Sequence, residues 1–267
     1  MLLVRYPAAF FKKTRVKIAN IANMGALIME KRELLYEGKA KRIYATEDQE
    51  IVWVEYKDSA TAFNGEKKAE IEGKGALNNG ITSLLFSKLQ QSGISSHFIK
   101  SISEREQLVK NVSIIPLEVV VRNIAAGSLA KRLGFPEGQL LKKPIVEFYY
   151  KDDALGDPLL TEAHINELAV ASSEEVKVLR TKALQVNTVL SSFFQKIGVL
   201  LVDFKLEFGK LANGDILLAD EISPDTCRLW DSETKEKFDK DVFRRDLGSL
   251  VEAYEKIYAK LKETQHV

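Results

Sequence analysis

The segment LLVDFKLEFGKLANGDILLADEISPD, residues 200–225, constrains the fold more than any other part of the chain. In its first half, apolar residues alternate with Asp203, Lys205 and Glu207. Such alternation is typical of a strand that packs one face on a core and presents charged side chains on the other. Asn213-Gly214 then interrupts the pattern, and this dipeptide favours a two-residue hairpin loop. We therefore predict an antiparallel hairpin with a row of charges along one face.

If the loop consists of these two residues alone, Glu207 lies directly opposite Asp220 on the second strand. Opposed side chains in an antiparallel pair are about 5 Å apart, and two carboxylates at that distance repel each other. A proton, a lysine or a metal ion stabilises such a pair, and hard oxygen ligands suit Mg²⁺ completed by substrate phosphates. Lys205 on the same face favours a site. The alternatives are solvated carboxylates on an exposed face, or a longer loop with a different pairing.

Hydrophobic periodicity divides the rest of the chain into short strands and a few helices. We expect strands within residues 33–46, 50–60, 97–112 (two short strands), 117–121, 142–150, 198–209 and 214–223. We expect helices within residues 76–93, 128–135, 174–197 and 238–261. This mixture predicts an α+β fold with antiparallel sheets in both halves and flanking helices. A change in sequence texture near Pro116 places a domain boundary between a β-rich domain, residues 30–113, and an α+β domain, residues 114–267.

The first 29 residues differ from the rest in charge, since they contain five basic residues and no acidic one. One interpretation is a targeting or membrane-surface segment. The other is an over-long start assignment or an added segment, with Met29 as the true start. We favour the second, because MEKRELLYEGKAKRIY runs directly from Met29 into a plausible first strand. We therefore expect residues 1–29 to form a basic extension outside the fold.

Composition excludes several classes of function. The chain of 267 residues has a formal net charge of +1, which gives no general attraction to nucleic acid or membranes. No apolar run is long enough to span a bilayer. The single Cys227 excludes an internal disulfide and a Cys-rich metal site. We expect a cytoplasmic protein with no nucleic-acid partner and no membrane partner.

Two lysines in LLYEGKAKRIY are candidates for anion binding. On a continuous strand, Lys39 and Lys41 would share one face and repel each other unless water or an anion lies between them. Gly38 beside them would let the backbone approach a ligand closely. An exposed, solvated edge strand is the alternative explanation.

The second half of the chain offers further candidates. Arg122 ends a buried strand and could bind a phosphate with two hydrogen bonds. Ser128 would be the N-cap of the helix that follows, where free N–H groups favour an anion. Arg228 lies in a turn beyond the hairpin, and Asp241 and Arg244 lie on one helical face. The alternatives are plain helix capping, a surface arginine and an ordinary intrahelical ion pair.

Four segments taken together resemble one known family. YEGKAKRIY, VVVRNIAAGSLAKRLG, LLVDFKLEFG and DEISPDTCRLWD occur in this order, and residues 34–261 are similar to SAICAR synthetases (phosphoribosylaminoimidazole-succinocarboxamide synthases). These carbon–nitrogen ligases of purine (IMP) biosynthesis join 5-aminoimidazole ribonucleotide carboxylate (CAIR) to L-aspartate, using Mg-ATP and yielding SAICAR, ADP and phosphate. The resemblance implies a kinase-like small lobe, an ATP-grasp-like second domain and ATP in the cleft between them. It also implies CAIR and L-aspartate as small-molecule partners, and we expect a homo-oligomer.

The resemblance also implies residue roles. For ATP binding these are Gly38, Lys39, Ala40, Lys41, Ile114, Lys151, Glu207 and Asp220, with Mg²⁺ on Glu207 and Asp220. For substrate binding they are Arg122, Ser128, Asp203, Lys205, Arg228, Asp241 and Arg244. Catalysis would rest on Lys39, Lys41, Lys205 and Asp220. Asn64 is a departure, because some members have Asp at this position, and no charged role is implied there.

Two other functions fit the same residues. A kinase-like small-molecule phosphotransferase would form ADP without an amine substrate. A non-catalytic nucleotide-binding module would bind ATP without turning it over. The intact pair of Glu207 and Asp220, together with Lys39 and Lys41, argues against the binding module.

Overall fold

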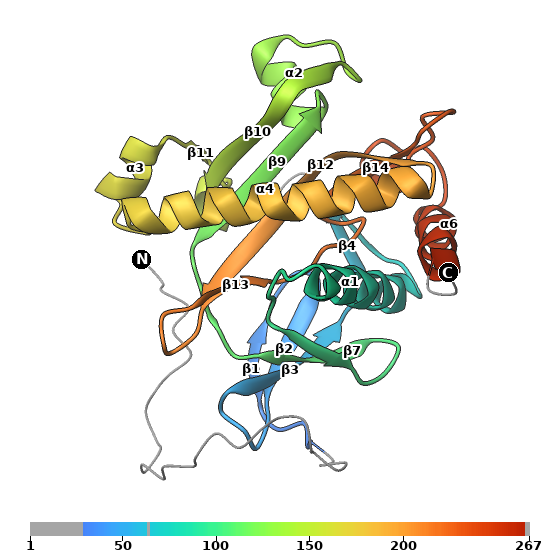
Figure 1. Ribbon diagram of the computed structural model, residues 1–267. Coiled ribbons are helices and arrows are strands. Elements are labelled where there is room, and N and C mark those ends of the chain that lie inside the picture. Colours follow the sequence, from blue (N-terminus) through green and yellow to red (C-terminus); the bar gives the residue numbers. More distant parts are fainter. Residues whose placement is uncertain (1–28, 63–64, 265–267) are drawn as a thin grey trace.

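The computed structural model of the protein describes residues 29–62 and 65–264. These residues form two antiparallel sheets, a separate two-stranded ribbon and flanking helices (Figure 1), so the predicted α+β class is confirmed. The basic extension predicted for residues 1–29 lies, apart from Met29, outside the described residues. None of the helices in the described part of the chain is long and apolar enough to cross a membrane.

The first sheet has five strands in the order β1-β2-β3-β7-β6. Their bounds are β1 (Leu34–Glu37), β2 (Lys41–Ala45), β3 (Ile51–Tyr56), β6 (Phe98–Ser101) and β7 (Glu106–Lys110). The single strand predicted across residues 33–46 is wrong, because the chain turns at residues 38–40 and β1 pairs back onto β2. The turn is closed by Gly38 N, which donates to the Lys41 carbonyl at 2.8 Å. Lys39 therefore lies in the turn and does not share a strand face with Lys41.

A two-stranded ribbon and a helix connect β3 to β6. The ribbon consists of β4 (Ser59–Ala62) and β5 (Lys67–Glu70), and the helix is α1 (Lys74–Gln91). As predicted from its spacing, α1 buries Ile81, Leu85 and Leu89, and it ends before Gly93. These three side chains belong to the largest core cluster, which also contains side chains of the second sheet. Helix α1 thus packs against both halves of the chain.

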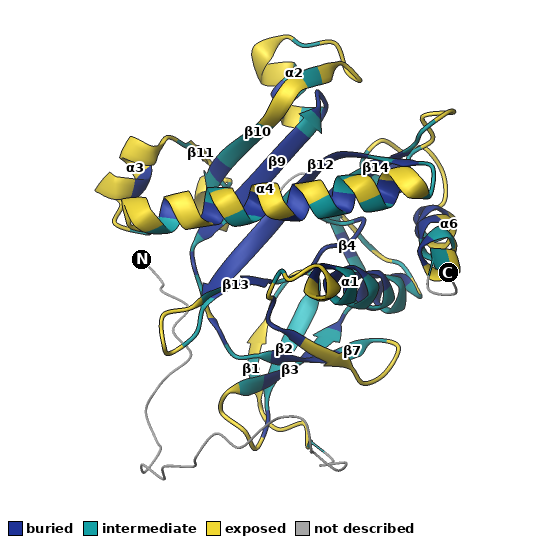
Figure 2. Cartoon of the chain, viewed as in Figure 1, coloured by how far each residue is buried: buried dark blue, intermediate teal, exposed yellow. Residues whose placement is uncertain are grey.

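The second sheet has seven strands, with β12 at its centre. Its strands are β8 (Ser113–Ile114), β9 (Leu117–Ile124), β10 (Leu140–Tyr150), β11 (Leu159–Leu160), β12 (Val199–Lys210), β13 (Ile216–Ala219) and β14 (Cys227–Asp231). Strand β12 pairs with β8, β9, β13 and β14, so residues from distant parts of the sequence meet along it. The long helix α4 (Ser173–Lys196) crosses one face of this sheet with its apolar side inward (Figure 2).

The predicted hairpin of β12 and β13 is present, but its register differs by one residue from the prediction. Lys210 lies opposite Ile216, and Glu207 lies opposite Ala219 rather than Asp220. The loop is longer than two residues, since Leu211 N donates to the Asp215 carbonyl and Gly214 has a φ of 91°. Asp220 follows the strand with a φ of 59°, so it leaves the strand direction instead of facing Glu207 across the ladder.

The remaining helices are short, apart from the last. They are α2 (Gly127–Leu133), the 3₁₀ helix η3 (Asp153–Leu155), α3 (Glu162–Glu167), α5 (Asp241–Arg244) and α6 (Leu250–Glu263). The single helix predicted for residues 238–261 is wrong. Asp246 and Gly248 have φ values of 52° and 146°, which break the helix, and Ser249 caps α6 by accepting from Glu252 N.

The N-cap predicted at Ser128 is also wrong. The N-cap position of α2 is Ala126, and no side chain caps this helix. Gly127, which has a positive φ of 53°, is the first residue of the helix, so the N-cap lies two residues before Ser128. The Ser128 hydroxyl instead accepts a hydrogen bond from Arg122 at 3.1 Å.

Candidate active site

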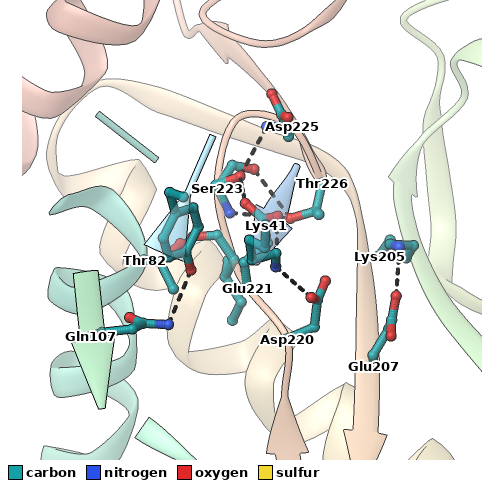
Figure 3. A network of polar contacts seen from close by, with 12 residues as sticks. Lys41, Thr82, Gln107, Lys205, Glu207, Asp220, Glu221, Ser223, Asp225 and Thr226 are labelled. Atoms are coloured by element: carbon teal, nitrogen blue, oxygen red, sulfur yellow. Dashed lines mark hydrogen bonds and ion pairs between the residues drawn. The ribbon is translucent and has the colours of Figure 1, made fainter. Parts of the chain in front are cut away.

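Three lysines and two carboxylates predicted from the sequence meet between the two sheets. Lys205 and Glu207 lie on the same face of β12, and their side chains are 2.9 Å apart. Lys151, just after β10, reaches the same Glu207 oxygen at 2.8 Å. Lys41 of the first sheet forms an ion pair with Asp220 (Figure 3). The predicted cluster is therefore present even though the predicted register is not, because Asp220 turns toward Lys41 after its strand ends.

These charges hold one another ionised in a buried setting. Burial alone would lower the pKa of Lys41, but the carboxylates of Asp220 and Glu221 raise it well above its ordinary value. Burial alone would raise the pKa of Asp220, but Lys41 and Lys205 lower it below its ordinary value. Burial alone would also raise the pKa of Glu207, but Lys205 and Lys151 lower it below its ordinary value. Both carboxylates are therefore negative at neutral pH.

The donor set at Glu207 and Asp220 fits a hard divalent cation. Lys151 and Lys205 both donate to Oε1 of Glu207, and Lys41 donates to Oδ1 of Asp220. No described residue donates a hydrogen bond to the second oxygen of either carboxylate. No group of three or more Asp, Glu, His or Cys side chains is arranged for a metal within the ranges 29–62 and 65–264. A cation held by these two carboxylates would need further oxygens, and Mg²⁺ typically takes those from phosphate and water.

A cavity of about 490 Å³ adjoins the cluster, and Lys205 lines it. Its wall includes Arg122 of β9 and Asp203 of β12, which lie opposite each other in neighbouring strands. Arg122 Nη1 donates to Asp203 at 2.7 Å, and its Nε donates to Glu147 at 3.0 Å. Arg122 is only 4% exposed. A guanidinium fixed by two carboxylates is presented to a ligand in one orientation.

A second arginine completes this wall. Arg228 on β14 donates from Nη1 to both oxygens of Asp203, at 2.9 and 3.1 Å, and from Nε to Asp241 at 3.0 Å. Arg244 donates to the other Asp241 oxygen at 2.6 Å. The intrahelical ion pair between Asp241 and Arg244, which was the alternative to a binding role, is present, but Asp241 also anchors Arg228. Arg244, Asp241 and Arg228 thus form a chain of ion pairs that connects α5 to the second sheet.

Gly127 leaves room for the Arg228 guanidinium. A Cβ atom at Gly127 would lie 2.3 Å from Arg228 Nη2 and 2.6 Å from its Cζ. Any side chain at Gly127 would therefore displace Arg228. This glycine lies within VVVRNIAAGSLAKRLG, and its requirement for a small residue could not be recognised without knowing where Arg228 lies.

The other predicted residues are more dispersed. Lys39 also lines the cavity, but its ammonium group pairs with Asp153 at 2.6 Å and is half exposed. Gly38 and Ala40 form the turn before Lys41 and contribute backbone hydrogen bonds. Ile114 pairs with Gly209 of β12, and its side chain packs in a small apolar cluster.

Several site residues were not predicted. Glu118 pairs with Lys205 at 2.8 Å, and Glu221 pairs with Lys41 at 2.9 Å. Tyr149 donates to Glu147 and accepts from Arg122, both near 3 Å. Glu118 precedes the buried run VVV, and an acidic residue at the start of an otherwise apolar strand could have identified it. Glu221 directly follows Asp220, and nothing local distinguishes the two.

A charge-dense cavity beside two antiparallel sheets, with basic side chains fixed by buried carboxylates, is the architecture of an enzyme that binds anionic small molecules. The SAICAR synthetase family model matches residues 34–261. A phosphoribosylaminoimidazole-succinocarboxamide synthase of Bacillus cereus is 68% identical over 239 residues, which cover 90% of this chain and 100% of that protein.

Solved structures agree with this match. The crystal structure of a phosphoribosylaminoimidazole-succinocarboxamide synthase from Ehrlichia chaffeensis has a TM-score of 0.84 at 49% identity, and covers 86% of this chain and 98% of that one. A SAICAR synthetase in complex with ADP has a TM-score of 0.83 at 51% identity, and covers 86% of this chain and 97% of that one. The chain belongs to the SAICAR synthetase family.

Proposed function

We propose that the cavity and the adjoining lysine–carboxylate cluster are where this SAICAR synthetase joins CAIR to L-aspartate. The enzyme is a carbon–nitrogen ligase that consumes ATP and yields SAICAR, ADP and phosphate in purine biosynthesis. The observation that carries the assignment of the site is that Lys205 belongs both to the cluster and to the cavity wall. A group held at Lys205 can therefore react with one held by the cluster.

The nucleotide belongs at the cluster in this proposal. The backbone of Gly38 and Ala40 would cover the phosphates, and Lys39, Lys41 and Lys151 would neutralise them. Ile114 would contact the adenine. Glu207 and Asp220 would hold Mg²⁺, which supplies charge neutralisation and orientation for the terminal phosphate.

The ribonucleotide belongs at the cavity wall in this proposal. Arg122, Ser128 and Arg228 would bind its phosphate, with both arginines held in position by Asp203. Asp241 and Arg244 would support Arg228. Lys205, whose ammonium group contacts Glu207, would then bind the CAIR carboxylate that reacts.

The chemistry explains why so many cations gather here. A carboxylate is a poor acyl donor because oxide is a poor leaving group, whereas an acyl phosphate releases phosphate. We propose that the CAIR carboxylate oxygen attacks the terminal phosphorus of ATP and displaces ADP. The aspartate amine then attacks the acyl carbon, phosphate leaves, and the amine proton passes to solvent. Lys41 and Lys205 lower the barrier by neutralising the charge that accumulates among three anionic reactants.

Three broader proposals accompany this assignment. We propose that the partners of the enzyme are its small-molecule substrates, CAIR and L-aspartate. We also propose that it works in the cytoplasm as a homo-oligomer. We propose residues 30–113 as the nucleotide domain, kinase-like in fold. We propose residues 114–267 as the ATP-grasp-like substrate and metal domain.

Phosphate release tests the function directly. The purified chain is incubated with Mg-ATP and CAIR, with and without L-aspartate, and phosphate and SAICAR are quantified. The expected result is phosphate release only when both substrates are present, in a one-to-one ratio with SAICAR. ADP formation without aspartate would identify a phosphotransferase if no phosphate is released, and a leaky acyl phosphate if phosphate is released. ATP binding without any turnover would identify a binding module.

A further inference from the structure

Glu221 is a buried carboxylate that the proposed reaction does not use. It follows Asp220 directly and is 4% exposed. Its Oε1 lies 2.9 Å from the Lys41 ammonium group, and its Oε2 accepts a hydrogen bond from the Ser223 hydroxyl at 2.5 Å (Figure 3). Both oxygens are therefore engaged, one by the first sheet and one by the segment after β13.

Ser223 organises the turn that leads into β14. Its hydroxyl accepts from Asp225 N at 3.1 Å, and its carbonyl accepts from Thr226 N and Cys227 N at 3.0 and 2.9 Å. Ser223 has no exposed surface. Thr226 and Cys227 line the cavity, and Arg228 follows them directly in the chain. The position of Ser223 therefore sets the position of the wall that carries Arg228.

We propose that Glu221 and Ser223 are positioning residues that couple nucleotide binding at Lys41 to ribonucleotide binding at the turn of residues 223–228. This inference rests on the proposed function. In the structure, the Lys41 ammonium group is shared between Asp220 and Glu221. A nucleotide phosphate bound at Lys41 competes with Glu221 for the ammonium group. The Glu221 carboxylate is then less neutralised and accepts a stronger hydrogen bond from the Ser223 hydroxyl. That bond holds the turn of residues 223–228 in the conformation that binds the ribonucleotide. By linkage, the ribonucleotide strengthens nucleotide binding by the same factor.

A neighbouring hydrogen bond provides a matched control. Thr82 of α1 donates from its buried hydroxyl to the Ile222 carbonyl at 3.2 Å. This bond reaches the backbone of the same segment, and neither Glu221 nor Lys41 takes part in it. Replacement of Thr82 by valine conserves the side-chain shape and removes a buried hydrogen bond. It therefore reproduces the loss of stability that a Ser223 variant causes in this segment, without removing the contact to Glu221.

The experiment measures a coupling factor by calorimetry. CAIR is titrated into the full chain with and without saturating Mg²⁺ and a non-hydrolysable ATP analogue, and the factor is the ratio of the two dissociation constants. For the wild type we expect a factor of about 5 or more in favour of CAIR binding, within the usual range of such couplings. Ser223→Ala should bring the factor close to 1, whereas Thr82→Val should keep the wild-type factor.

Glu221→Gln is the second variant, because it keeps the side-chain shape and an acceptor for Ser223 while removing the charge that pairs with Lys41. It too should lose the coupling. A wild-type factor of 1, an unchanged factor in both Ser223→Ala and Glu221→Gln, or an equal loss in Thr82→Val would overturn the proposal. Failure of the wild type to bind CAIR at all would instead contradict the proposed function, and this inference with it.

Discussion

Lys41 on β2 and Asp220 after β13 form an ion pair that joins the first sheet to the second. Lys41 is separated from Asp220 by most of the chain, and both side chains are largely buried. The left-handed backbone of Asp220, with a φ of 59°, directs its carboxylate toward this lysine. The pair therefore places a cation of one sheet and a proposed metal ligand of the other at a single point.

Asp220→Asn should abolish most of the turnover while preserving the fold. Asparagine tolerates a left-handed backbone, and Lys41 keeps Glu221 as a partner at 2.9 Å. We expect kcat to fall by about 10²–10³-fold, the usual cost of removing one preorganised electrostatic group. The measurement is steady-state SAICAR formation together with thermal unfolding.

Asp215→Asn is the matched control, since Asp215 lies exposed in the loop of the same hairpin. Its kcat should equal that of the wild type. Near-normal turnover in Asp220→Asn would contradict the assignment of Asp220 to the nucleotide and metal.

Gly127→Ala should impair ribonucleotide binding. The new Cβ would lie 2.3 Å from Arg228 Nη2, so the guanidinium must move away from Asp203. We expect the KM for CAIR to rise at least about tenfold, which corresponds to about 1.4 kcal/mol of lost binding. The KM for ATP should change little, and kinetics with each substrate varied in turn would measure both.

Gly134→Ala separates this effect from backbone strain. Gly134 also has a positive φ, 70°, but a Cβ atom added there would meet no other atom within 4 Å. Both variants should lose about 1–2 kcal/mol of stability from the left-handed backbone. If Gly134→Ala raised the KM for CAIR as much as Gly127→Ala, contact with Arg228 would not be the cause.

His97 should make stability depend on pH in mildly acidic solution. Burial lowers the pKa of His97 from about 6.5 to about 3, and among described residues no partner bonds its Nδ1. As pH falls below about 6.5, the unfolded chain takes up a proton at His97 that the folded chain does not, so folding stability decreases. The expected slope from this group approaches about 1.4 kcal/mol per pH unit. Urea unfolding of wild type and His97→Gln at pH 7.0, 6.0 and 5.0 would show a shallower slope in the variant, and equal slopes would contradict the assignment.

A buried cluster around Asp225 should stabilise the junction of α1 with α6. Lys74, which is 1% exposed, donates to one Asp225 oxygen at 2.7 Å, and the Tyr254 hydroxyl donates to the other at 2.6 Å. Tyr254→Phe removes a hydrogen bond to a charged group, which costs about 1.5–3 kcal/mol of unfolding free energy. Urea unfolding measures the loss.

Tyr258→Phe is the matched control on the same helix, because no described residue hydrogen-bonds to the Tyr258 hydroxyl. Its unfolding free energy should change by less than about 0.5 kcal/mol. Equal losses in the two tyrosine variants would show that packing, and not the bond to Asp225, is responsible.

Local patterns were sufficient to predict the elements that bury a regular apolar face. Helices α1 and α4 and the hairpin strand β12 have such faces, and their predicted positions agree with the structure. The turn predicted at Arg228 is wrong, because Cys227–Asp231 form strand β14 through their pairing with β12. Three other errors fall where one residue changes the backbone direction. The turn at residues 38–40, the break at Gly248 and the hairpin register each depend on a left-handed residue or a tight turn within a polar stretch, where periodicity carries no information.

Some residues of the candidate site could be predicted to lie together, but the pairings between them could not. Alternation along β12 places Lys205 and Glu207 on one face, and the structure confirms it. The pairing of Arg122 with Asp203 depends on the register between β9 and β12, which are far apart in sequence. The contact of Lys41 with Glu221 requires the two sheets to meet. Such long-range contacts arise from packing and not from any local sequence preference.

Transfer of isotope from CAIR to phosphate tests whether an oxygen of the CAIR carboxylate attacks the terminal phosphorus of ATP and leaves with the phosphate. CAIR labelled with ¹⁸O in its carboxylate is converted with Mg-ATP and L-aspartate, and the released phosphate is analysed by mass spectrometry. We expect one ¹⁸O atom in each phosphate, because the carboxylate oxygen that attacks phosphorus leaves with it. Phosphate that contains no ¹⁸O would show that the CAIR carboxylate is not phosphorylated by ATP.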